Sequence, residues 1–198
     1  MKKLVLLAVL ALALPTAVFA SSNIDYTNSG GTLSGSMSGL SLSGSVLIAV
    51  NSNAGLITGS DLGSVSFQTG ALQSGGSLQQ GGTLAAGGWF TITGNGTNGV
   101  PNGTLFSGTF SGPVAWNMTT LANGTHNYTL TGTLSAAPGS SVGVTVQLTV
   151  NTGKGFFNGC TRISSGDTNV VVPEPGSLSL LGTGLIALGG TIRRKLKG

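Results

Sequence analysis

Apolar and polar residues alternate along the central part of the chain, and this alternation predicts β-strands. The clearest examples are the segments Phe90–Thr93, Tyr128–Thr131 and Val142–Val150, in which every second residue is apolar. Successive side chains of a strand point to opposite faces, so a period of two places the apolar residues on one face. No window keeps a helical period without an interrupting glycine. We therefore predict an all-β domain, a single β-sandwich rich in Gly, Ser and Thr, with a β-solenoid as the alternative.

A five-residue pattern recurs within this region: apolar, Ser or Thr, Gly, Ser or Thr, apolar. Within a strand, the glycine would share the inner face with the two apolar residues and leave room there for a bulky neighbour or a crossing backbone. The copies are unevenly spaced, which argues against a regular solenoid repeat. They begin at Leu33, Leu42, Phe106 and Leu130.

One hairpin can be predicted in register. The apolar faces of its strands are formed by Val114, Trp116 and Met118, and by Tyr128, Leu130 and Leu134. A two-residue turn would place these two sets on opposite faces, whereas the three-residue loop Ala122–Gly124 places them on one face. This loop gives the pairs Trp116–Leu130 and Met118–Tyr128. It needs a glycine in its left-handed position, which its last residue supplies, and it puts His126 beside Thr120 near the turn.

The first twenty residues have the three-part organisation of a secretory signal peptide. Lys2 and Lys3 precede an apolar run, Leu4–Leu14, that is too short to span a hydrocarbon core about 30 Å thick. Small residues follow, and we predict cleavage by signal peptidase between Ala20 and Ser21.

The C-terminus carries a second predicted sorting signal. A Val-Pro-Glu-Pro motif precedes a charge-free segment, residues 176–192, which we predict to be a transmembrane helix near the lower length limit for spanning. The motif consists of Val172, Pro173, Glu174 and Pro175. The cations that follow the segment would remain in the cytoplasm and stop transfer. They are Arg193, Arg194, Lys195 and Lys197.

In this order, the motif, the helix and the basic end resemble the PEP-CTERM sorting tail of exosortase substrates. The resemblance covers the tail alone. It implies export by a Gram-negative bacterium, passage through the inner membrane, and removal of the tail by exosortase, which recognises Pro173–Pro175. The final location would be the cell surface or the medium, often alongside exopolysaccharide production. The alternative is a plain membrane anchor behind a proline-rich stalk.

These features predict four regions. They are a signal peptide (1–20), an all-β extracytoplasmic domain (21–160), a stalk or linker (161–171) and the sorting tail (172–198).

The charge of the chain lies mainly at its ends. The formal net charge is +4, but all cations except Lys154 and Arg162 belong to the predicted signal peptide or to the C-terminal tail. Two cations cannot release many counterions from a phosphate backbone. Nucleic acid is therefore excluded as a partner of the domain.

Few groups in the domain could carry catalysis or bind a metal. Asp61 and His126 are the only carboxylate and imidazole expected within the folded core, whereas a glycosidase needs two carboxylates and a metal site three or four ligands. We predict no catalytic, cofactor-binding or metal-binding residues and no cofactor, and hence no enzyme. The single cysteine, Cys160, excludes an intramolecular disulfide and is either idle or paired with another chain.

Two functions fit this composition. The first is a structural protein of the surface or extracellular matrix, associated with exopolysaccharide or biofilm. The second is a carbohydrate-binding module or adhesin, whose aromatic platform would be Trp89 with Phe90, or Trp116 beside Asn117, although we expect Trp116 to be buried. A surface-binding threonine array is a third option, which needs a flat regular stack that the uneven spacing does not support.

Overall fold

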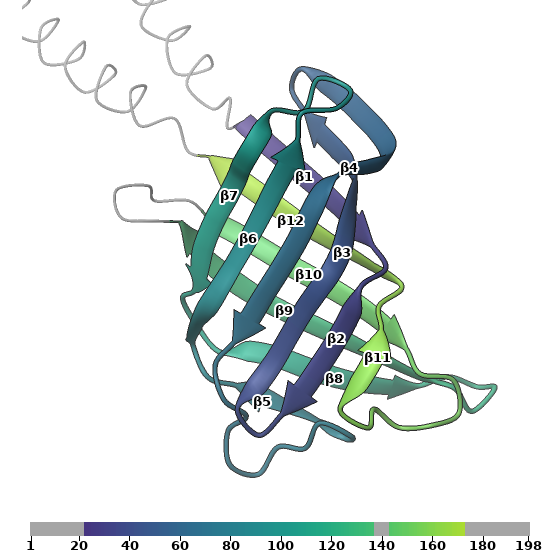
Figure 1. The fold of residues 1–198 in the computed structure, drawn as a ribbon. Helices are drawn as coiled ribbons and strands as arrows, with labels where there is room; N and C mark the ends of the chain where they lie inside the picture. Colours follow the sequence, from purple (N-terminus) through teal and green to yellow (C-terminus); the bar gives the residue numbers. More distant parts are fainter. Residues whose placement is uncertain (1–21, 137–142, 173–198) are drawn as a thin grey trace, which may run out of the picture. The chain divides into compact units, whose positions relative to one another are not determined.

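The computed structural model describes residues 22–136 and 143–172, and the fold concerns one compact unit, residues 23–171 (Figure 1). Its regular structure consists of strands, which confirms the predicted all-β class. The strands are β1 (Ser22–Ser29), β2 (Thr32–Ser36), β3 (Gly39–Ser52), β4 (Gly55–Thr69), β5 (Gly81–Leu84), β6 (Gly87–Asn95), β7 (Asn102–Phe110), β8 (Val114–Thr120), β9 (His126–Ala136), β10 (Gly143–Asn151), β11 (Cys160–Arg162) and β12 (Ser165–Val172).

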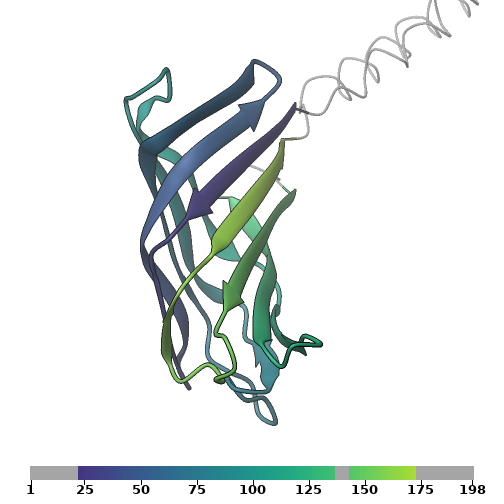
Figure 2. The ribbon, with the colours of Figure 1, turned by 90° about the vertical axis from the view of Figure 1, so that its right-hand side faces the viewer.

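The strands form one sheet that closes on itself as an eight-stranded barrel. β1 is hydrogen-bonded to β12 on one side and to β3 on the other, and this completes the ring β1-β12-β10-β9-β7-β6-β4-β3. Figures 1 and 2 show the strands crossing on two opposite walls. The structure thus differs from the predicted sandwich and from the solenoid alternative. Register shifts in β1 and β3 allow the sheet to bend, and closure pairs the edges that two separate sheets would leave free.

Four further strands extend the wall at one end of the barrel. The edge of β9 is shared, since β8 pairs with residues 126–131 and β7 with residues 134–136. The edge of β3 is shared in the same way by β2 and β1. β5 then adds to β8, and β11 adds to β2.

The interior is filled by the apolar residues that the alternation predicted. Phe90 and Ile92 of β6 are buried, and the inward residues of β10 are at most 3% exposed. The latter are Val144, Val146, Leu148 and Val150.

The five-residue pattern has the predicted orientation in the copies that begin at Phe106 and Leu130, where apolar and glycine positions face inward and hydroxyls outward. Gly132 lies beneath Phe110, so that a Cβ there would be 3.0 Å from the ring. In the Leu33 copy, Gly35 is similarly close to Leu40 and Phe157, but β2 ends before Met37, which is 70% exposed.

The Leu42 copy does not follow the predicted orientation. The register of β3 against β4 shifts between Leu42 and Ser45, and Ser45 is buried in the place expected for the glycine. The Ser45 side chain is satisfied there, because its Oγ accepts a hydrogen bond from Asn28 Nδ2 at 2.7 Å. A bulge of this kind cannot be read from a period of two.

The hairpin between β8 and β9 has the predicted register. Trp116 pairs with Leu130, and Thr120 pairs with His126. The Gly124 backbone has a φ of 78°, the left-handed conformation that the three-residue loop requires.

The prediction of a stalk over residues 161–171 is wrong. This segment lies in β11 and β12, and β12 pairs with β10 over seven residues. Its alternation was too short and too polar to separate it from a linker, and only its place in the barrel, between β1 and β10, buries Thr168 and Val170.

Candidate functional site

The predicted sites of proteolytic cleavage lie next to the ends of β1 and β12, the two strands that close the barrel. β1 begins at Ser22, directly after the predicted cleavage site Ala20–Ser21, and β12 ends at Val172, directly before Pro173. The sorting motif beyond Val172, the basic end and the predicted helix 176–192 lie outside the described residues. Residues 22–136 and 143–172 contain no helix with the length and hydropathy of a membrane span.

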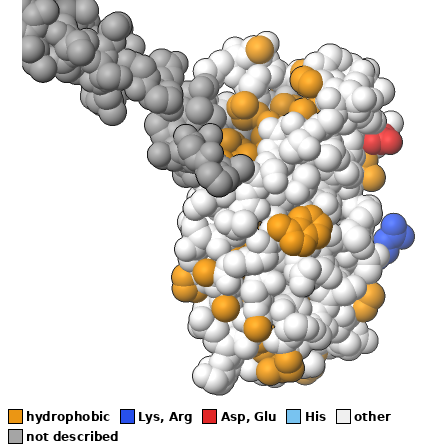
Figure 3. All heavy atoms as spheres, turned by 60° about the vertical axis from the view of Figure 1, so that its left-hand side comes forward, with side chains coloured by type: hydrophobic (Ala, Val, Ile, Leu, Met, Phe, Trp, Pro, Cys, Tyr) orange, Lys and Arg blue, Asp and Glu red, His pale blue; other side chains and the backbone are white. Residues whose placement is uncertain are grey.

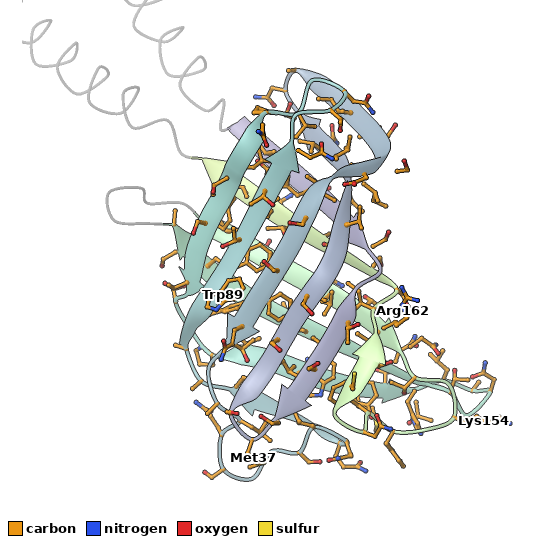
Figure 4. All side chains as sticks on the ribbon, viewed as in Figure 1. Met37, Trp89, Lys154 and Arg162 are labelled. Carbon is orange, nitrogen blue, oxygen red and sulfur yellow. The ribbon has the colours of Figure 1, made fainter. Side chains whose placement is uncertain are left out.

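Of the two residues predicted as an aromatic platform, only Trp89 is accessible. Its side chain is 45% exposed on the outer face of β6 (Figure 4), whereas Phe90 is 1% exposed and stacks on Phe67 inside the barrel. The alternation of the strand sends these neighbours to opposite faces. The alternative platform at Trp116 is excluded, because Trp116 is fully buried.

Trp89 belongs to a row of outward side chains that crosses four strands, which we call the outer row. Trp89 of β6 pairs with Gln68 of β4, Gln68 pairs with Ser41 of β3, and Ser41 pairs with Ser34 of β2. Directly opposed residues of an antiparallel pair have their Cβ atoms about 5 Å apart on one face. The outer row therefore brings together an exposed indole, an amide and two hydroxyls.

A shallow groove of about 240 Å³ follows the part of this row beyond Trp89. Gln68 lines this groove together with serine side chains, which belong to β2, to β3 and to the turn between these two strands. Among the described residues, no hydrogen bond engages the side chains of Gln68, Ser41 or Ser34. The sequence analysis named Trp89 as a candidate aromatic platform, but it missed the three partners because segments of the chain far from Trp89 supply them.

A second shallow groove, of about 350 Å³, contains Asp61. The Asp61 carboxylate accepts hydrogen bonds from the Gly63 N–H (3.1 Å) and from Asn95 Nδ2 (3.2 Å). Asp61 is the only titratable residue in its lining, and the described residues hold no group of three or more His, Cys, Asp or Glu side chains that could bind a metal. The contacts of Asp61 are those of a residue that ties the middle of β4 to the end of β6.

His126 lies where the hairpin predicted it, but it is not solvated as a turn residue would be. It is 8% exposed, its Nδ1 is 3.0 Å from Thr120 Oγ1, and its ring stacks on Phe156 at a centroid distance of 4.4 Å. These contacts give His126 a structural role at the start of β9.

Cys160 is a free and exposed thiol. It lies on β11, which is the last strand at one end of the sheet order, and it pairs with Ser34. No disulfide partner exists within the chain, because Cys160 is its single cysteine.

Asp25 of β1 and Asp167 of β12 lie on neighbouring strands, close enough for their charges to interact. Partial burial raises the pKa of Asp25 above its ordinary value of 3.8, and the neighbouring negative charge of Asp167 raises it further. The junction that closes the barrel thus contains an unfavourable charge pair.

Comparison with known proteins identifies the tail and finds no match for the barrel. Residues 171–195 match the family model described as the PEP-CTERM protein-sorting motif, which confirms the resemblance of the tail. The motif indicates an exported protein that exosortase sorts and processes. No match was found among curated proteins or among solved structures.

Proposed function

We propose that the barrel is a structural protein of the bacterial surface or extracellular matrix, associated with exopolysaccharide or biofilm. The observation that carries the proposal is the sorting motif at residues 171–195, which follows a domain with an almost uncharged surface. Before processing, the predicted helix 176–192 would hold the chain in the inner membrane of a Gram-negative cell. Removal of the signal peptide and of the sorting tail would leave the barrel strands intact.

The outer face of the barrel supports association with hydrated polysaccharide. Hydroxyl and amide side chains form rows across β9, β10 and β12, such as Thr133–Thr145–Asn169. Figure 3 shows one face on which charged side chains are few and hydrophobic ones are scattered. Such a surface offers many hydrogen-bonding groups and little charge to repel or attract ionic partners.

The proposal includes the absence of enzymatic activity. Asp61 is bound to neighbouring backbone and amide groups, and His126 is held by Thr120 and Phe156. General acid–base catalysis needs titratable groups placed around a common reacting atom, and the groove that contains Asp61 is not lined by His126.

A carbohydrate-binding module or adhesin is the second candidate. The observation that favours it is the exposure of Trp89, because tryptophan is enriched among the residues that contribute most to binding.

The sorting route is tested by the intact mass of the protein from the native host, measured in the membrane and in the medium, with and without its exosortase. In the wild type, we expect the protein to have lost residues 1–20 and to end near Pro173. In the strain without exosortase, we expect the tail to be retained. Replacement of Pro173 and Pro175 by alanine should have the same effect as loss of the enzyme. An intact Lys195–Gly198 end in both strains would instead show a plain membrane anchor.

Matrix association is tested by fractionating the extracellular matrix of the same strains. The processed protein should sediment with the exopolysaccharide and leave that fraction when the polysaccharide is absent. A protein that stays soluble in both cases would contradict the proposal without affecting the sorting route.

A further inference from the structure

We propose that the outer row is a binding site for a neutral polysaccharide chain, which stacks on Trp89 and is hydrogen-bonded by Gln68, Ser41 and Ser34. This inference rests on the proposed association with exopolysaccharide and assigns it to one place on the barrel. In this row an exposed aromatic ring and unengaged polar side chains share one face.

Trp89 supplies the apolar contact. The chain has two tryptophans, and the other one, Trp116, is fully buried with its indole N–H bonded to the Leu78 carbonyl at 2.9 Å. Trp89 has no such bond within the described residues and presents both an apolar ring and a free N–H donor. A sugar ring matches this pair of properties, since it has an apolar C–H face and hydroxyl groups around its edge.

The polar part of the row supplies direction and specificity. Gln68 offers an amide donor and acceptor directly beside Trp89, and Ser41 and Ser34 offer hydroxyls on the next two strands. Three strand spacings separate Trp89 from Ser34, or about 14 Å at roughly 4.8 Å per strand. The row is therefore long enough for a few consecutive sugar units that run across the strands.

The backbone under Trp89 is fixed before any ligand binds. Phe90 anchors the strand from the inner face by stacking on Phe67 at 5.9 Å. On the other side of Trp89, Gly88 has a φ of 77° and lies so close to the Gln68 carbonyl oxygen that any Cβ would overlap it. A platform held in this way loses little conformational freedom on binding.

The charge around the row selects a neutral ligand. No residue of the row or of its groove is ionisable. The nearest cation along the ladders is Arg162, which pairs with Thr32 two positions from Ser34. One cation at the far end does not provide the repeated contacts that a polyanionic chain would need.

The test is affinity electrophoresis of the processed protein in native gels that contain a soluble β-glucan, a galactomannan or hydroxyethylcellulose, with alginate as the polyanionic comparison. We expect retardation by at least one neutral polysaccharide and none by alginate. Trp89→Ala should weaken the apparent affinity roughly tenfold or more, as is usual for a central tryptophan anchor. Gln68→Ala should weaken it less, and Trp89→Phe should retain part of it.

Phe156→Ala is the matched control, because Phe156 is exposed to a similar extent (47%) but lies in the loop between β10 and β11, outside the row. It should leave retardation unchanged. Intrinsic fluorescence gives a second readout, since binding should shift the emission of Trp89 to shorter wavelength while Trp116 stays constant.

Two results would overturn the inference. Retardation that Trp89→Ala does not reduce would place binding elsewhere, and the matrix proposal would stand without this site. The absence of retardation by all three neutral polysaccharides, while the protein still sediments with the host matrix, would exclude a neutral-chain site and again leave the matrix proposal intact. Circular dichroism of each variant verifies that a lost interaction is not a lost fold.

Discussion

Two aromatic clusters lie inside the barrel, and they are built on different chemistry. The phenylalanine cluster consists of Phe67, Phe90, Phe106 and Phe110 from β4, β6 and β7, with ring centroids 5.9–6.3 Å apart. These rings contact one another and have no polar atom to satisfy. The cluster stabilises the barrel wall by burial of apolar area alone.

The second group, the Trp116 cluster, consists of Trp116, Tyr128 and Phe157. Trp116 and Tyr128 stack at 5.0 Å, and each donates a hydrogen bond to a loop carbonyl, Trp116 to Leu78 and Tyr128 to Gln79. The Tyr128 hydroxyl also accepts a bond of 3.0 Å from the Phe157 N–H. These bonds attach the loop before β5 and the loop before β11 to the β8–β9 hairpin.

The difference shows how one type of core residue serves two purposes. The phenylalanine cluster joins strands that already pair with one another. The Trp116 cluster fixes segments that have few ladder bonds of their own, and it does so with directional bonds in an apolar surrounding, where losing a partner is costly.

The largest effect should come from truncating one member of each cluster. Trp116→Ala and Phe90→Ala each remove a fully buried ring, and each should lower the free energy of unfolding by about 3–5 kcal/mol. Trp116→Ala should in addition increase hydrogen exchange in residues 72–80, whereas Phe90→Ala should leave that loop as protected as the rest of the barrel. Denaturant titration and exchange mass spectrometry measure these two quantities. Equal loop protection in both variants would contradict the comparison.

Tyr128→Phe separates the bonds of the Trp116 cluster from its packing. The ring remains, but the Gln79 carbonyl and the Phe157 N–H lose their partner, so the free energy of unfolding should fall by about 1–3 kcal/mol. Exchange should rise in both attached loops. Loss of stability without any change in loop exchange would show that the hydroxyl does not hold them.

The smallest effect concerns the junction of β1 and β12, whose strands carry no member of either cluster. It tests whether both clusters unfold as one unit. Because the pKa of Asp25 is raised in the folded state, this group's contribution to stability is fully present below the unfolded value of 3.8 and is lost as the pH rises through the raised value. Asp25→Asn should therefore increase stability slightly at neutral pH and reduce this part of the pH dependence.

Asp167→Asn is the comparison variant for this prediction. It removes the second cause of the raised pKa but not the burial, so it should lower the pKa of Asp25 only in part. Denaturant titrations at acidic and neutral pH, followed by Trp116 fluorescence and by exchange at Phe90, measure the effect. Different shifts at the two probes would show that the clusters unfold separately.

The sequence allowed a good part of the fold to be predicted, and much less of the candidate site. The hairpin register around Trp116 and Leu130 followed from alternation and from Gly124, because both signals lie within one short segment. Trp89 was identified from its residue type, as one of the two tryptophans of the chain. Its partner Gln68 was not, because the segment that contains β5 separates the two strands that pair here.

By itself, the sequence determined the strand class, the sorting motif at the C-terminus, and the inward-facing residues of segments such as Val144–Val150, since these depend on short-range periodicity and on contiguous motifs. Only the tertiary structure decided that the sheet closes, that residues 161–171 belong to it, and that Ser34, Ser41 and Gln68 line up with Trp89. Those outcomes depend on pairing between distant segments and on bulges such as the one before Ser45, where a single extra residue changes the face of every side chain that follows.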